Sequence, residues 1–297
     1  MAELKPFRGD YYLWNYLPSK PAAVIFLLLF LVVTGAIAWR MYRTKTWYCS
    51  VFVIGGLFEV IGYAGRASAY DKTDKLMPYV IQSTYILLAP ALFAASIYMV
   101  LRRVIIQAHA ETHSIIPVKW LTKIFVLGDV LSFLVQGGAA GMMVVSDLAK
   151  TGQNIVIAGL FIQIVVFGFF VVTTVTFQLR MRECPTRESE DPNVPWEARI
   201  YMLYAVSGLI MVRSVFRVVE FIMGHDGYLL QHEWPLYLFD CVLMFAVMVI
   251  FFVRTPSTRQ PIRRSTFELS LLERVPSSQV LSPDPRLTRS VANNGTG

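Results

Sequence analysis

Three charged residues lie within one apolar stretch of the chain, residues 209–224, which reads LIMVRSVFRVVEFIMG. Arg213, Arg217 and Glu220 are separated by four and then three residues, so a helix places all three on one face. Each charge at bilayer depth costs about 2.5–3.5 kcal/mol, so this face must point into a helix bundle and not into lipid. Charges in such a place pair with one another, or they bind a charged headgroup or a proton.

The rest of the chain has the composition of a membrane protein. Of its 297 residues 55% are hydrophobic, and the mean hydropathy is +0.52, which excludes a soluble globular domain. We expect an all-α integral membrane protein, a bundle of seven transmembrane helices. The expected spans are about 21–39, 48–66, 79–101, 120–145, 154–177, 199–222 and 235–253, each near the ~20 residues that a bilayer requires.

Lysine and arginine favour one orientation of this bundle. They gather in the loops after the first, third and fifth spans and in the tail, whereas the loop at 223–234 has none. The positive-inside rule therefore predicts an external N-terminus and a cytosolic C-terminus. The expected organisation is a short extracellular N-terminus (1–20), a seven-span domain (21–253) and a basic, disordered cytosolic tail (254–297).

With this orientation, most intramembrane polar residues fall in the outer half of the second, third, fourth, sixth and seventh spans. We expect them to line a polar cavity, with three arginines facing four acids. One acid then lacks a basic partner, and it is either protonated or available to a cationic ligand. Buried ion pairs that only fix helix register are the alternative reading. The candidate substrate-binding or translocation residues are Glu59, Arg66, Gln82, Asp129, Gln136, Arg213, Arg217, Glu220 and Asp240.

Other chemistry has little support in the sequence. The histidine pairs His109/His113 and His225/His232 fall on opposite sides of the membrane in this topology, so they do not form one metal site. No span holds a lysine at depth, which excludes a retinal Schiff base, and no phosphate-binding glycine loop is present. We therefore expect no enzyme activity, no cofactor and no nucleic-acid partner. The arginine-rich tail favours anionic lipid headgroups.

A series of motifs runs in order along the chain. They are Glu59-x-x-Gly62-Tyr63-x-x-Arg66, Tyr79-x-x-Gln82, Leu88-Ala89-Pro90-Ala91-x-x-Ala94-Ala95-Ser96-Ile97-Tyr98, Phe125-x-x-Gly128-Asp129, Gln136, Gly159-Leu160-x-x-Gln163, Arg213-x-x-Phe216-Arg217-x-x-Glu220 and Glu233-x-x-x-Tyr237-x-x-Asp240. Over about residues 20–253 this series resembles the fungal lipid-translocating exporter family, the aminocholesterol-resistance and sphingoid long-chain-base resistance proteins.

The resemblance implies seven spans with an external N-terminus, in the plasma membrane or internal membranes of a fungus. It also implies outward movement of, or resistance to, toxic amphipathic lipids such as sphingoid bases. It does not supply catalytic residues, so the candidate site rests on the charges at depth.

Two functions follow as hypotheses. The first is an exporter or flippase for lipid-like compounds, in which an acid among Glu59, Glu220 and Asp240 holds an ammonium group while the apolar tail stays in lipid. Arg213 and Arg217 would pair with the remaining acids, or with a phosphate if the headgroup carries one. The second is a seven-span lipid sensor or receptor that regulates a membrane stress response. The receptor motifs Asp-Arg-Tyr after the third span and Asn-Pro-x-x-Tyr in the seventh are absent from the sequence.

Overall fold

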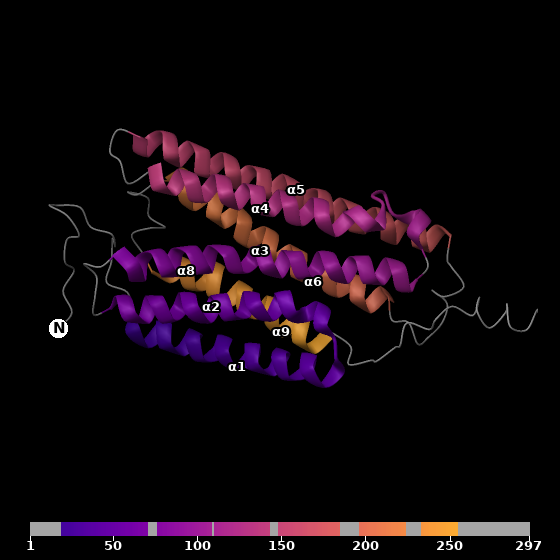
Figure 1. Cartoon of the computed structure of the whole chain (residues 1–297), viewed down its shortest axis with the longest axis horizontal. Coiled ribbons are helices and arrows are strands. Elements are labelled where there is room, and N and C mark those ends of the chain that lie inside the picture. Colours follow the sequence, from indigo (N-terminus) through magenta and orange to yellow (C-terminus); the bar gives the residue numbers. More distant parts are fainter. Residues whose placement is uncertain are drawn as a thin grey trace, which may run out of the picture. The chain divides into compact units, whose positions relative to one another are not determined.

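The computed structural model describes residues 19–70, 76–108, 110–142, 148–184, 196–223 and 233–254. Within these ranges the chain forms helices and no strand (Figure 1). The elements are α1 (Lys20–Thr44), η1 (Trp47–Cys49), α2 (Ser50–Ala69), α3 (Leu76–Gln107), η2 (Glu111–His113), α4 (Val118–Met142), α5 (Ala149–Glu183), α6 (Trp196–Met223), α8 (Trp234–Leu236), η5 (Tyr237–Val242) and α9 (Leu243–Arg254). Residues 1–18 and 255–297, which include nearly all of the predicted N-terminal segment and tail, lie outside the described ranges.

Six helical segments in the described part of the chain are long and apolar enough to cross a membrane. They correspond to α1, to η1 with α2, to α3, α5 and α6, and to the continuous run from α8 through η5 to α9. The predicted fourth span overlaps α4, which has 25 residues and is not among the six. The structure thus confirms a multi-pass helical membrane protein, and the seventh span stays a prediction.

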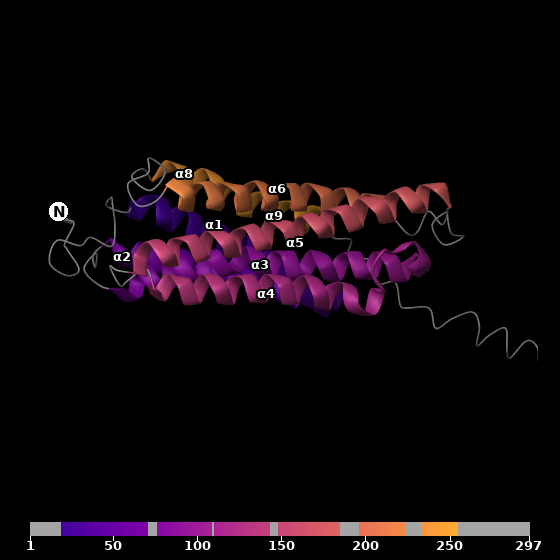
Figure 2. The ribbon, with the colours of Figure 1, turned by 90° about the horizontal axis from the view of Figure 1, so that it is seen from above.

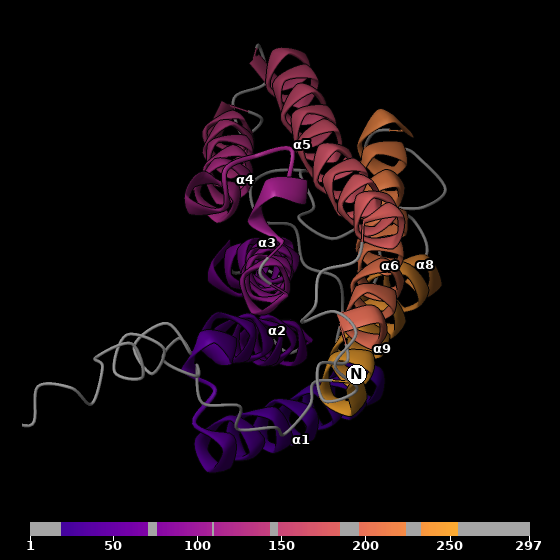
Figure 3. The ribbon, with the colours of Figure 1, turned by 90° about the vertical axis from the view of Figure 1, so that its right-hand side faces the viewer.

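The helices form a ring in which neighbours in sequence pack side by side. The order runs from α1 to α6, α6 packs against α9, and α9 packs against α1 to close the ring. Helices α3 and α6 also touch across the middle, and Figure 3 shows this arrangement end-on. Figure 2 shows the same helices lying roughly parallel along their length. We call the end where α1 begins the first end and the opposite end the second end.

Apolar side chains cover the outside of this ring. Val32, Leu134 and Val165 are 62–68% exposed, as expected where helices face lipid and not water. Near the second end the interior is also apolar, because Phe52 stacks on Phe251 with ring centroids 3.8 Å apart and lies 4.6 Å from Phe93. Buried polar side chains are therefore exceptions in a bundle whose surface and interior are mainly apolar.

Helix α2 approaches α3 closely because of a glycine. A Cβ at Gly62 would lie 2.6 Å from Ile86 Cγ1 and 3.3 Å from the Ile86 backbone nitrogen, which leaves no room for a larger residue. Close helix contacts of this kind are typical of small residues in membrane bundles. The contact turns the polar face of α2 inward, so that Glu59, one turn before Gly62, is 1% exposed.

Candidate functional site

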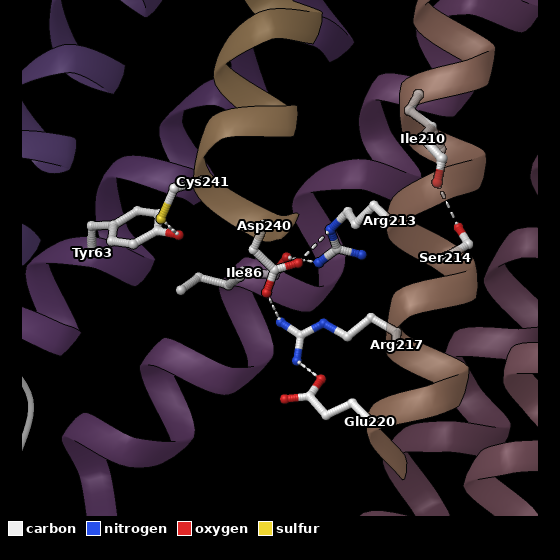
Figure 4. A network of polar contacts seen from close by, with 9 residues as sticks. All are labelled: Tyr63, Ile86, Ile210, Arg213, Ser214, Arg217, Glu220, Asp240 and Cys241. Atoms are coloured by element: carbon white, nitrogen blue, oxygen red, sulfur yellow. Dashed lines mark hydrogen bonds and ion pairs between the residues drawn. The ribbon is translucent and has the colours of Figure 1, made fainter. Parts of the chain in front are cut away.

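Asp240 lies between two arginines from α6. Its Oδ1 is 3.0 Å from Arg213 Nε, and its Oδ2 accepts a hydrogen bond from Arg217 Nη2 (Figure 4). Arg217 Nη1 also donates to Glu220 Oε2 over 2.8 Å, within the same helix. The spacing of four residues places both guanidinium groups on one face of α6, as the sequence predicted. Asp240 is 1% exposed, so this is an interior ion-pair network.

Arg213 has a second acceptor on α3. Its Nη2 donates to the backbone carbonyl of Ile86 over 2.9 Å (Figure 4). In an α-helix the Ile86 carbonyl would accept from the backbone nitrogen of residue 90, but Pro90 has no N–H to give. The proline inside α3 therefore frees the acceptor that Arg213 uses, and links α3 to α6 through one backbone oxygen.

Asp240 belongs to η5, which is a π-helical turn and not a regular α-helix. Such turns are rare and occur frequently at functional sites. The next residue, Cys241, is buried and lies 2.6 Å from the hydroxyl oxygen of Tyr63 on α2 (Figure 4). The π turn thus directs one side chain to α6 and its neighbour to α2.

Glu59 completes what we call the central cluster: Glu59, Arg213, Arg217, Glu220 and Asp240. It interacts electrostatically with Arg213, Arg217 and Asp240. Within the described ranges its Oε1 has no hydrogen-bond partner, and no arginine or lysine lies within ion-pair distance of its carboxylate. The cluster therefore holds two bases and three acids, and Glu59 is the acid that remains outside the ion pairs.

Arg66 belongs to a separate cluster near the first end. Its Nη2 lies 2.6 Å from Glu233 Oε1, and its Nε donates to the Tyr237 hydroxyl over 3.1 Å. Tyr237 in turn donates to Glu233 over 3.0 Å, and the Ser19 backbone nitrogen donates to the same carboxylate over 2.9 Å. Arg66 is fully buried, so this cluster fastens the beginnings of α1 and α8 to the end of α2.

Glu233 was missed among the candidate site residues, although it stands in one of the motifs. Its spacing of four residues before Tyr237 and seven before Asp240 was the signal, because a helix places all three on one face. Glu233 changes the predicted balance of three arginines against four acids, because it is a fifth acid. Since Arg66 pairs with Glu233, two of the predicted acids, Glu59 and Asp129, are without an arginine partner in the described ranges, and not one.

Three predicted residues lie apart from the central cluster. Asp129 on α4 accepts a hydrogen bond from Tyr98 on α3 over 2.9 Å, and Gln136 donates to Gln163 on α5 over 3.2 Å. Gln82 is buried where α3 meets α2. No hydrogen bond or ion pair between described residues joins them to Asp240. The expected single group from five spans is therefore divided, and α4 contributes to a different interior region.

Most of the chain, including the central cluster, matches a known protein family. The family described as RTA1 like protein matches residues 52–261, which cover every residue of the central cluster. The chain belongs to the RTA1-like family. The resemblance to lipid-translocating exporters drawn from the motifs is thereby confirmed.

Several relatives of this RTA1-like chain come from Saccharomyces cerevisiae. It is 36% identical to Protein RTA1 over 274 residues, with 84% of this chain and 86% of that one covered. It is 33% identical to Protoporphyrin uptake protein 1, with coverage of 82% and 92%. It is 23% identical to Sphingoid long-chain base transporter RSB1, with coverage of 69% and 63%. No solved structure matches the chain.

Proposed function

We propose that this RTA1-like chain is a membrane transporter, an exporter or flippase, for amphipathic lipid-like compounds with a cationic headgroup, and that it confers resistance to them. A relative named a sphingoid long-chain base transporter supports a lipid substrate. Another relative is named for protoporphyrin uptake, so substrates differ within the family. The choice of a cationic headgroup comes from the chain's own residues.

The observation that carries this choice is that Glu59 forms no ion pair with any arginine or lysine of the described ranges. Arg213 and Arg217 already pair with Asp240 and Glu220, which leaves Glu59 as the acid of the central cluster without an arginine partner in the described ranges. Glu59 is buried beside them without a hydrogen bond to Oε1 in the described part of the chain. An ammonium group would supply the missing positive charge, because a buried charge requires a partner. The apolar tail of the substrate would remain in lipid between the helices.

The proposal includes the full topology. Helix α4 serves as the seventh span, since its 25 residues exceed the ~20 that a bilayer requires and it packs between α3 and α5. Seven spans put the two termini on opposite sides, with the N-terminus outside and the C-terminus in the cytosol. The first end then faces outward, and Glu59, the tenth of the 20 residues of α2, lies near the middle of its helix. The proposed location is the plasma membrane.

The first test is protection of cells by a Glu59→Gln variant. Cells that lack the protein are given the wild-type chain, Glu59→Gln or Glu197→Gln, and growth is measured on increasing concentrations of a sphingoid base. We expect Glu59→Gln to protect no better than an empty vector, because the substituted amide carries no charge for the ammonium group.

Glu197→Gln is the matched control, since Glu197 is 54% exposed near the second end. It should protect as the wild type does, and all three chains should reach the membrane in equal amounts. If Glu59→Gln protects cells fully at an equal amount of protein in the membrane, Glu59 takes no part in transport.

A further inference from the structure

A second set of buried polar side chains follows one face of α4. Asp129, Ser132 and Gln136 are separated by three and four residues, so they share a helix face. They are 5%, 1% and 3% exposed, respectively. The central cluster uses none of the three.

Asp129 has one partner and one open oxygen. Its Oδ2 accepts from the Tyr98 hydroxyl, while Oδ1 has no hydrogen-bond partner in the described ranges. Ser132 Oγ, one turn away, is likewise buried without a partner there. The Tyr98 ring is fixed by Phe125 and Phe170, whose ring centroids lie 5.2 and 4.6 Å away. The oxygen Oδ1 of Asp129 therefore lacks a partner in a closely packed part of the interior.

Charged groups do not neutralise Asp129. Among described residues Tyr98 is the one titratable group that interacts with it, and α5 packs here with apolar side chains such as Val166 and Phe170. A buried carboxylate without a base requires a proton or another cation. A cation such as Ca²⁺ takes six to eight oxygen ligands, whereas two oxygens are open here. A Cβ on the neighbouring Gly128 would lie 2.8 Å from Val166, so the helices leave little room.

We propose that Asp129 is a proton-binding site distinct from the Glu59 site. A proton from the aqueous phase at the first end bonds to the open oxygen Oδ1, while Tyr98 continues to donate to Oδ2. Release breaks the Oδ1–H bond and returns the proton to water. Gln136 and Gln163 continue the polar face toward the first end, and the seven residues from Asp129 to Gln136 span about 10 Å.

If the proposed transport is correct, proton binding at Asp129 is coupled to cation binding at Glu59. The coupling rests on the proposed function, but proton binding itself does not. The two are therefore tested separately.

Proton binding is tested by infrared difference spectroscopy on the purified full chain in lipid nanodiscs during a pH titration. We expect a carbonyl band of a protonated carboxyl group that titrates in the wild type and in Glu59→Gln and is lost in Asp129→Asn. In Tyr98→Phe the band should persist at a shifted frequency, because the hydrogen bond to Oδ2 is removed. This second variant keeps the test decisive if Asp129→Asn folds poorly.

Two results would overturn the proposal: a titrating band that Asp129→Asn leaves unchanged, or a band that Tyr98→Phe does not shift. Coupling is read from transport in proteoliposomes with and without a pH gradient. Asp129→Asn should lose the effect of the gradient and keep downhill movement, whereas Glu59→Gln should lose movement altogether. If Glu59→Gln loses transport but the wild type shows no titrating carboxyl band, the proton site is contradicted. The proposed function is then still supported.

Discussion

Asp240 is the residue on which the central cluster depends, because two buried arginines share its carboxylate. Removing one member of a buried ion pair leaves an uncompensated charge, which costs more than the pair itself contributes. Glu220 differs, since its partner Arg217 retains Asp240 if Glu220 is neutralised. The two acids therefore have unequal structural roles although they lie in one network.

We predict that Asp240→Asn lowers the free energy of unfolding by about 3–5 kcal/mol. Glu220→Gln should cost about 1 kcal/mol, since one charge-assisted hydrogen bond is replaced by a weaker one. Denaturant titration of both variants in detergent micelles measures the difference. Equal losses would show that Arg213 and Arg217 do not share Asp240.

At the scale of the element, the contact between α2 and α3 positions Glu59. Gly62 has no free space toward Ile86, and the Ile86 carbonyl accepts from Arg213. A larger residue at this position would push the two helices apart, and it would disturb the acid on α2 and the acceptor on α3 together.

We predict that Gly62→Ala destabilises the protein by about 1–3 kcal/mol, the usual cost of overpacking. Gly35→Ala on α1 is the matched control, because nothing lies within 4 Å of a Cβ there. Alanine is the better helix former by about 0.8–1.0 kcal/mol, so the control should be neutral or stabilising. Thermal unfolding in detergent distinguishes the two, and a neutral Gly62→Ala would contradict the close approach of α2 to α3.

Some of this arrangement follows from sequence and some does not. The spacing of Arg213 and Arg217 predicts a shared helix face, and Pro90 predicts a free carbonyl on the third span. That these two features meet depends on how α3 and α6 cross, which no local pattern encodes. The π turn at Asp240 has no propensity signal, and Glu233 precedes the predicted start of its span, so neither entered the predicted site.

At the scale of the molecule, the orientation in the membrane can be read from a native cysteine. Of the three cysteines, Cys184 is exposed, whereas Cys49 and Cys241 are buried. Cys184 directly follows α5 at the second end, and Lys150 is exposed at the opposite end of the same helix. The proposed topology therefore assigns these two positions to opposite sides.

We predict that a membrane-impermeant maleimide leaves the wild-type chain unlabelled on intact cells and labels it after permeabilisation. The Lys150→Cys variant should be labelled on intact cells. Gel mobility with a bulky maleimide measures both. Labelling of the wild-type chain on intact cells would reverse the orientation and place the first end in the cytosol.

In the proposed function, the buried carboxylate of Glu59 binds the headgroup of a transported cationic amphipath. Its most direct test is the movement of a labelled sphingoid base across proteoliposomes that contain purified wild-type chain, Glu59→Gln or Glu197→Gln. We expect rapid movement with the wild type and Glu197→Gln, and a rate at the protein-free background with Glu59→Gln of equal folded amount. Equal rates for Glu59→Gln and the wild type would contradict the claim. Background rates for all three, with cells still protected, would indicate that the chain senses lipid and signals to another exporter.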